Sequence, residues 1–158
     1  MKAASINEIK QELKAMAPQR LAEVCLRLAR YKKENKELLT YLLFEAADPD
    51  AYTRSVKEEI SEAFTTVPTS HLYFAKKNLR KILRLAQKYI RYAGSKTVEA
   101  DVLLHYCRLL KALPLPHQHH QALNSLYQGG LKKIRLAISS LHEDLQHDFL
   151  VQLEELEE

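Results

Sequence analysis

Apolar residues recur along most of this chain at intervals of three and four positions, the spacing that lines one face of an α-helix. Polar stretches and Pro or Gly residues interrupt the pattern, which divides the chain into about eight predicted helices. We expect them near residues 6–16, 18–31, 38–44, 49–67, 71–93 and 98–113, then from about residue 117 with a break at Gly129–Gly130, and finally through residues 145–156.

Helix-end signals support this division. Ser5 and Glu8 have capping-box spacing, in which the serine hydroxyl accepts from the third helical amide and the glutamate bonds back to the cap. Asp48 followed by Pro49 predicts an N-cap and a first turn. Gly94 stands where a left-handed residue ends a helix.

The third predicted helix is apolar on most of its sides. A polar stretch, residues 32–36, predicts a turn before it. A helix that is apolar all round is typical of a buried element. We therefore expect its large side chains to be buried, namely Leu38, Leu39, Tyr41, Leu42, Leu43 and Phe44.

Composition favours an all-α fold. The chain of 158 residues has only three glycines, whereas average usage would supply about eleven. Its commonest residues are those that lose least on entering a helix. No stretch has the length and apolarity of a membrane span or a signal peptide, and the two cysteines show no disulfide or metal-binding spacing, so we expect a cytoplasmic protein without a membrane association.

A short string recurs three times. Leu26-Arg27-Leu28-Ala29 resembles Leu83-Arg84-Leu85-Ala86 and Ile134-Arg135-Leu136-Ala137, and each copy would begin a helical hairpin. The hairpins would span residues 18–47, 70–113 and 117–156 of a single domain, 1–158. Stacked hairpins would form a short solenoid of the HEAT or armadillo sort; an irregular helical bundle is the alternative, because Leu, Arg and Ala are common in any helix.

The helix at residues 71–93, which Ser70 is expected to cap, is strongly cationic. Residues 71–96 contain eight Lys or Arg and no Asp or Glu. A helical wheel places the charges opposite the apolar face that begins at Leu72. We take the following as candidate binding residues for an anionic partner: Lys77, Arg80, Lys81, Arg84, Lys88 and Arg91.

Three anionic partners fit this basic face. An acidic protein is the leading prediction, which makes the chain a protein-binding scaffold or adaptor. Sequence-independent binding of nucleic acid is the alternative, with Tyr73 and Tyr92 available for stacking. The third partner is the chain's own end, because residues 136–158 contain seven acidic residues and no Lys or Arg.

The histidines and cysteines do not form a recognisable chemical motif. His117, His119 and His120 are close in sequence, as are His142 and His147, but none of them has the spacing of a helical metal site. Cys25 lies at core spacing beside Val24 and Leu28. No nucleophile elbow, Walker loop or dinucleotide fingerprint occurs, so we expect no enzyme activity, metal or cofactor.

In its overall texture, the chain resembles the small all-helical bacterial families that have no assigned function. The resemblance lies in LRLARYKKENKELLTYLLFEA followed by NLRKILRLAQKYIRY, and it covers most of residues 5–156. It implies a helical domain that acts through contact, and it implies no active-site residue.

Overall fold

The computed structural model describes residues 1–115 and 121–157, and in this part of the chain it contains eight α-helices and no strand. The all-α prediction is therefore confirmed. The helices are α1 (Ile6–Ala15), α2 (Pro18–Tyr31), α3 (Lys33–Thr40), α4 (Pro49–Thr65), α5 (Leu72–Ala93), α6 (Lys96–Ala112), α7 (Gln121–Ile138) and α8 (Glu143–Glu157), with a π-helical segment, η1 (Tyr41–Glu45), after α3.

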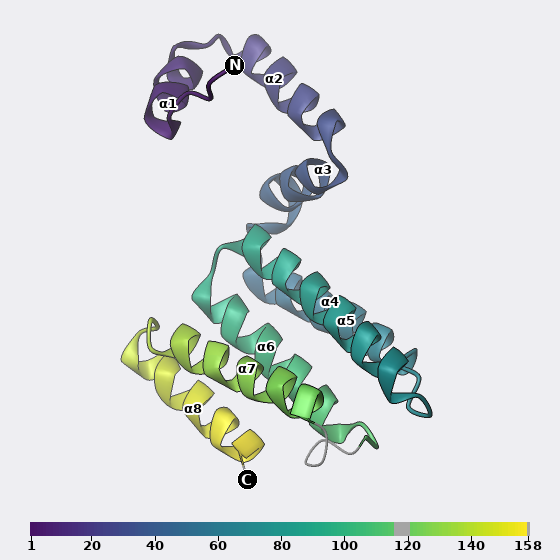
Figure 1. The fold of residues 1–158 in the computed structure, drawn as a ribbon. Helices are drawn as coiled ribbons and strands as arrows, with labels where there is room; N and C mark the ends of the chain where they lie inside the picture. The colour runs from purple at the N-terminus through teal and green to yellow at the C-terminus, as the bar shows by residue number, and fades with distance from the viewer. Residues whose placement is uncertain (116–120, 158) are drawn as a thin grey trace. The chain divides into compact units, whose positions relative to one another are not determined.

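The chain divides into two compact units, Met1–Phe44 and Glu45–Glu158. The expected domain of residues 1–158 thus comprises two units, and the expected hairpin at residues 18–47 extends across their boundary. In the first unit, α2 packs against α3 as a helical hairpin (Figure 1). The Asn35 side-chain amide donates to the carbonyl of Leu28 at 2.9 Å and ties the two helices together.

Two expectations for this hairpin are wrong. Residues 32–36 do not form a turn, because only Lys32 leaves the helical conformation and α3 begins at Lys33. Leu42, Leu43 and Phe44 are not buried but lie 56%, 64% and 78% exposed. The hairpin supplies only two helices, and two helices leave most of their apolar faces uncovered.

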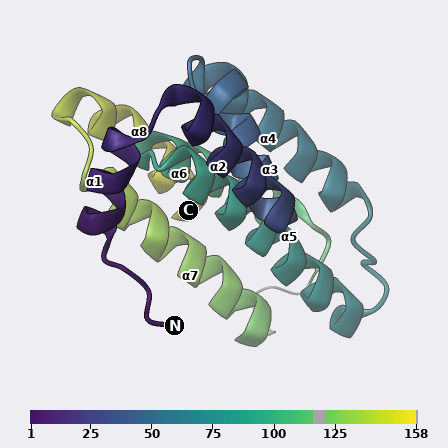
Figure 2. The ribbon, with the colours of Figure 1, turned by 90° about the horizontal axis from the view of Figure 1, so that it is seen from above.

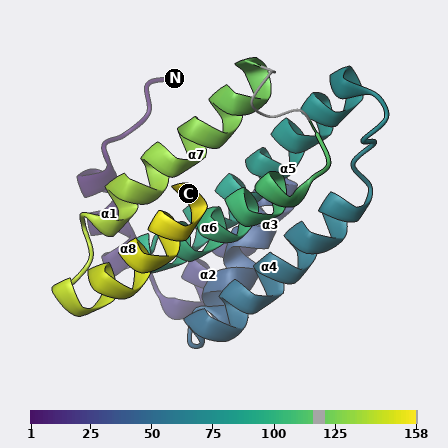
Figure 3. The same cartoon turned by 90° about the horizontal axis from the view of Figure 1, so that it is seen from below.

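The second unit is built around α6. Helix α6 packs against α4, α5, α7 and α8, with α8 at one edge of the unit and α4 at the other (Figures 1 and 3). Tyr106 on α6 is fully buried, its ring meets Phe64 edge-on at 5.3 Å, and its hydroxyl donates to the carbonyl of Leu79. One central helix with neighbours on all sides is typical of a helical bundle.

The recurring string does not occupy equivalent positions. Leu26 of the first copy is exposed, Leu83 of the second is half-buried, and Ile134 of the third is fully buried. Each copy does lie in the first helix of a hairpin, in α2, α5 and α7. The string therefore marks helix-forming sequence without a shared packing role.

Most helix-end predictions are confirmed. Asp48 accepts from the amide of Ala51 at 2.9 Å, and Ser5 and Glu8 form the complete capping box. Gly94 adopts the left-handed conformation, with φ of 59°, at the end of α5. Ser70 does not cap α5: the cap residue is His71, whose side chain makes no capping bond, because the helix begins one residue later than expected.

Helix α7 runs through Gly129 and Gly130 without the expected interruption. A Cβ atom on Gly130 would lie 2.6 Å from the sulfur of Cys107, whereas one on Gly129 would meet nothing within 4 Å. Gly130 therefore lets α7 approach α6 closely. The start of this helix expected near residue 117 lies outside the described residues.

Candidate functional site

The basic face predicted from the sequence lies on the solvent side of α5. Its opposite face supplies four core residues, Ala75, Leu79, Ile82 and Ala86, as the wheel predicts. Five of the six predicted cations are exposed, and the sixth, Lys88, is half-buried with its ammonium 4.9 Å from the ring centre of Tyr89. We call the six residues Lys77, Arg80, Lys81, Arg84, Lys88 and Arg91 the basic stripe.

Most charges of the basic stripe lack a counter-charge. Among the described residues, no ion pair or side-chain hydrogen bond forms at Lys77, Arg80, Lys81, Arg84 or Arg91. Some cations elsewhere in this unit are paired: Lys57 contacts Asp101 at 2.9 Å, and Lys96 contacts Glu99 at 2.7 Å. The stripe thus places five cations without a described counter-charge on a single helix of the second unit.

The acidic helix α8 packs on a different part of the unit. It lies against α6 and α7, whereas α5 packs against α4, α6 and α7 (Figure 3). Its side chains are held there by Arg108, which donates to Gln152 at 2.8 Å, and by Arg135, which pairs with Glu157. Among the described residues of the acidic end, Glu157 pairs with Arg135 of α7, Asp144 lies beside His142, and no carboxylate pairs with the basic stripe.

Aromatic side chains lie exposed at the N-terminal end of α5. Tyr73 and Phe74 are 69% and 53% exposed, and their rings meet edge-on at 5.4 Å. His71 packs edge-on against Phe74 at 6.2 Å. Tyr92, the second predicted stacking residue, is instead half-buried with its ring 6.2 Å from that of Tyr89.

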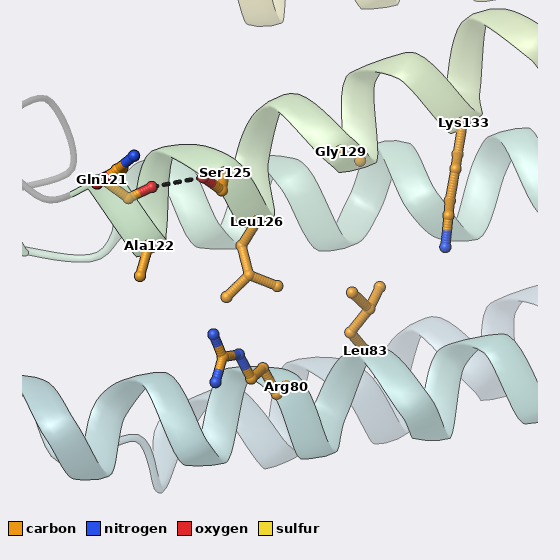
Figure 4. Close-up of a pocket in the computed structure, with 9 residues that line it drawn as sticks. Arg80, Leu83, Gln121, Ala122, Ser125, Leu126, Gly129 and Lys133 are labelled. Atoms are coloured by element: carbon orange, nitrogen blue, oxygen red, sulfur yellow. Dashed lines mark hydrogen bonds between the residues drawn. The ribbon is translucent and has the colours of Figure 1, made fainter.

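A groove of about 470 Å³ lies between α5 and α7, beside the basic stripe. Figures 2 and 4 show the two helices that form its walls, and Arg80 and Lys133 extend into the space between them from opposite sides. Leu83 and Leu126 supply apolar surface between these charges. Lys133 was not predicted from the sequence, although it lies four residues after Gly129 and therefore on the same face of α7.

A polar network that the sequence analysis also missed joins α4 to α6. Lys57 and Ser61 lie one turn apart on α4, opposite Asp101 and His105 on α6. Ser61 Oγ lies 2.7 Å from His105 Nε2 and donates its proton to the carbonyl of Lys57. Burial, with the nearby Lys57 charge as the next contribution, lowers the pKa of His105.

The hydrogen bonds of this network join one helix to the next. With the hydroxyl proton of Ser61 directed to the carbonyl of Lys57, the contact is a hydrogen bond when His105 Nε2 donates to the serine oxygen. Asp101 is engaged by Lys57. The four side chains therefore align α4 with α6, and we assign them a structural role.

The described residues bring no three His, Cys, Asp or Glu side chains together in a group that could hold a metal ion. His142 lies 3.4 Å from Asp144, with both side chains largely exposed, while His117, His119 and His120 lie outside the described residues. Burial raises the pKa of the Cys107 thiol to about 12, so it behaves as a core residue. Cys25, predicted to be a core residue, is only half-buried.

Comparisons of the chain with known protein families, with curated proteins and with solved structures found no match. Among the described helices, none combines the length and the apolar character needed to cross a membrane.

Proposed function

We propose that the protein is a non-enzymatic interaction domain that binds an acidic protein surface through the basic stripe. The observation that carries the proposal is the set of exposed cations on α5 that have no counter-charge among the described residues. Desolvated pairs between these cations and a partner's carboxylates would fix the register of the complex and accelerate the encounter. A cytoplasmic location, which the two free cysteines favour, belongs to the same proposal.

The groove beside the basic stripe favours a protein partner. The α5–α7 groove gives the partner an apolar recess between Arg80 and Lys133, and a helix or loop with an apolar residue flanked by carboxylates fits this arrangement. The stripe also lies on a rigid helix whose opposite face is in the core, so binding would cost little backbone ordering.

Sequence-independent nucleic-acid binding is the second candidate. Its specific support is Tyr73, an exposed ring one helical turn before Lys77, because bases stack on exposed aromatic rings beside phosphate-binding cations. Single-stranded nucleic acid would then follow the stripe with its phosphates.

A salt titration with two labelled probes separates the candidates. The probes are a Glu-rich helical peptide and a random-sequence single-stranded oligonucleotide of about 20 nucleotides. We expect the peptide to bind at low salt and the combined Lys77→Glu and Arg84→Glu variant to lose at least about tenfold in affinity. Tight binding of the oligonucleotide alone, with a salt slope that the same variant reduces by about 1.4, would establish the second candidate instead.

The matched control is the combined Arg54→Glu and Lys132→Glu variant. Both residues are exposed, lie on helices of the same unit and make no ion pair with a described residue, and the change in net charge is the same. We expect this control to retain most of the binding. If neither probe binds the unchanged protein at low salt, the proposal is wrong.

A further inference from the structure

The helical hairpin of the first unit exposes an unusual amount of apolar surface. Within residues 1–44, none of the side chains in α1, α2 or α3 is buried. The large exposed residues on α2 and the segment after α3 that line a groove are Leu26, Leu28, Leu42, Leu43 and Phe44, whereas the exposed Tyr31 lines none. A contiguous patch of this kind is typical of an interaction surface.

Two grooves divide this surface, and they share one floor. Ala29 and Leu39 line both grooves. The first groove, of about 250 Å³, is completed by Cys25, Leu28, Asn35, Leu38 and Leu42. The second, of about 560 Å³, adds Leu26, Leu43 and Phe44. Side by side, the grooves form an apolar strip along the hairpin, the shape into which an amphipathic helix places its apolar residues.

The rim of the second groove is cationic. Arg30, Lys32, Lys33 and Lys36 line it, and no acidic residue does. Of these four cations, only Lys33 forms an ion pair with a described residue, since its ammonium lies 3.6 Å from the Glu37 carboxylate. A partner with complementary charge therefore needs carboxylates beside the apolar residues that enter the groove.

The chain's own segments are poor occupants of this site. The first unit of a second copy carries nine Lys or Arg against five Asp or Glu, so two such surfaces would repel each other. Helix α1 carries Lys10 and Lys14 as well as two glutamates. The acidic helix α8 uses Phe149, Leu153 and Leu156 in the core of its own unit.

We propose that the α2–α3 hairpin is a second binding site, which takes an acidic amphipathic helix of another protein. The helix lays its apolar stripe over Ala29 and Leu39, and its carboxylates meet the cations of the second groove's rim. This site shares no residue with the basic stripe on α5, so the protein would bind two acidic partners or two parts of one.

The test uses the full chain and two synthetic peptides of about 18 residues, long enough for about five helical turns. Both have leucines at helical spacing; one has Glu at the flanking positions and the other has Lys. We expect the Glu peptide to bind and the Lys peptide to bind at least about tenfold more weakly near 50 mM salt. Equal binding of the two peptides, or no binding of the Glu peptide, would overturn the proposal.

Four variants locate the peptide on the hairpin. We expect Lys33→Glu with Lys36→Glu, and separately Leu43→Asp, to weaken binding of the Glu peptide about tenfold or more. The matched controls are Lys10→Glu with Lys14→Glu, and Tyr31→Asp, which alter exposed residues that line neither groove. If the controls weaken binding as much as the groove variants do, the peptide does not bind at the α2–α3 hairpin.

Two further results would replace the proposed occupant with part of this chain. Sedimentation that shows a dimer of the unchanged protein, dissociated by Leu43→Asp, would make a second copy the occupant. Binding of the Glu peptide only after removal of residues 1–15 would make α1 the occupant. The stripe variant Lys77→Glu with Arg84→Glu should leave binding to the hairpin intact, so this site and the function proposed for α5 can fail independently.

Discussion

Protonation of His105 destabilises the folded protein. Its Nε2 atom lies 2.7 Å from Ser61 Oγ on the neighbouring helix. Burial, together with the Lys57 charge, lowers the pKa of His105 below the ordinary 6.5. The folded protein therefore binds fewer protons here than the unfolded chain does between the two pKa values. Stability rises with pH through that window and is lost as the pH falls below about 6.5.

We predict that the free energy of unfolding decreases between about pH 7.5 and pH 5.5, and that His105→Gln reduces this dependence because glutamine does not titrate. Urea unfolding at several pH values measures it. His142→Gln is the matched control, since His142 is an exposed histidine of the same unit. A slope that survives His105→Gln would assign the acid sensitivity to another group.

At the scale of the helix, α7 contains two neighbouring glycines, only one of which is packed against another helix. Gly130 faces the sulfur of Cys107, and Gly129 faces open space. We predict that Gly130→Ala lowers the free energy of unfolding by about 1–3 kcal/mol, because the new methyl group forces α6 and α7 apart. Gly129→Ala should raise it by about 0.5–1 kcal/mol, because alanine loses less entropy in a helix.

Thermal or urea unfolding of the two variants measures the difference, and each variant is the control for the other. Cys107→Ala removes the sulfur that the new methyl group would meet, so the double variant should recover part of the loss caused by Gly130→Ala. Equal effects of the two glycine substitutions would show that the close approach of α6 and α7 is not limiting.

Helix α5 shows what local sequence can predict. The spacing of Ala75, Leu79, Ile82 and Ala86 gives the core face, and Gly94 gives the end, because both signals lie within one helix. The exposed stripe follows from the same periodicity. Sequence reasoning could not place Lys133 beside Arg80, since their proximity depends on how α7 packs against the rest of its unit.

The missed features all depend on contacts between helices or on the absence of such contacts. The link from Ser61 to His105 joins residues 44 positions apart. Leu43 and Phe44 have the composition of a buried segment, yet nothing in the first unit covers them. Periodicity identifies an apolar face, but it does not say whether a neighbour exists to bury it.

At the scale of the whole molecule, the two units differ in the core they contain. The second unit buries Leu79, Leu103, Tyr106, Leu110 and Ile134 almost completely, whereas α1, α2 and α3 bury no residue. Segments with few buried contacts open at low free energy, and their amides exchange early.

We predict that backbone amides in residues 18–40 exchange with deuterium at least about 100-fold faster than those of α6 around Tyr106. Hydrogen exchange followed by mass spectrometry measures both regions in one experiment, and the matched internal control is α4, which should exchange slowly because Ile60 and Phe64 are buried. Saturating Glu-flanked peptide should slow exchange in residues 18–40. Equal protection of both units without peptide would show that the first unit has a core after all.

The π-helical segment at residues 41–45 has a consequence for how this chain tolerates insertion and deletion. A π turn holds one residue more than an α turn, so it is the structural equivalent of a one-residue insertion into a helix. Here the extra residue falls among Leu42, Leu43 and Phe44, which are divided between the two grooves of the hairpin. Deletion of one residue within the segment would leave a continuous helix. It would also rotate every side chain after the deletion relative to α3. The length of this turn therefore determines which leucine lines each groove.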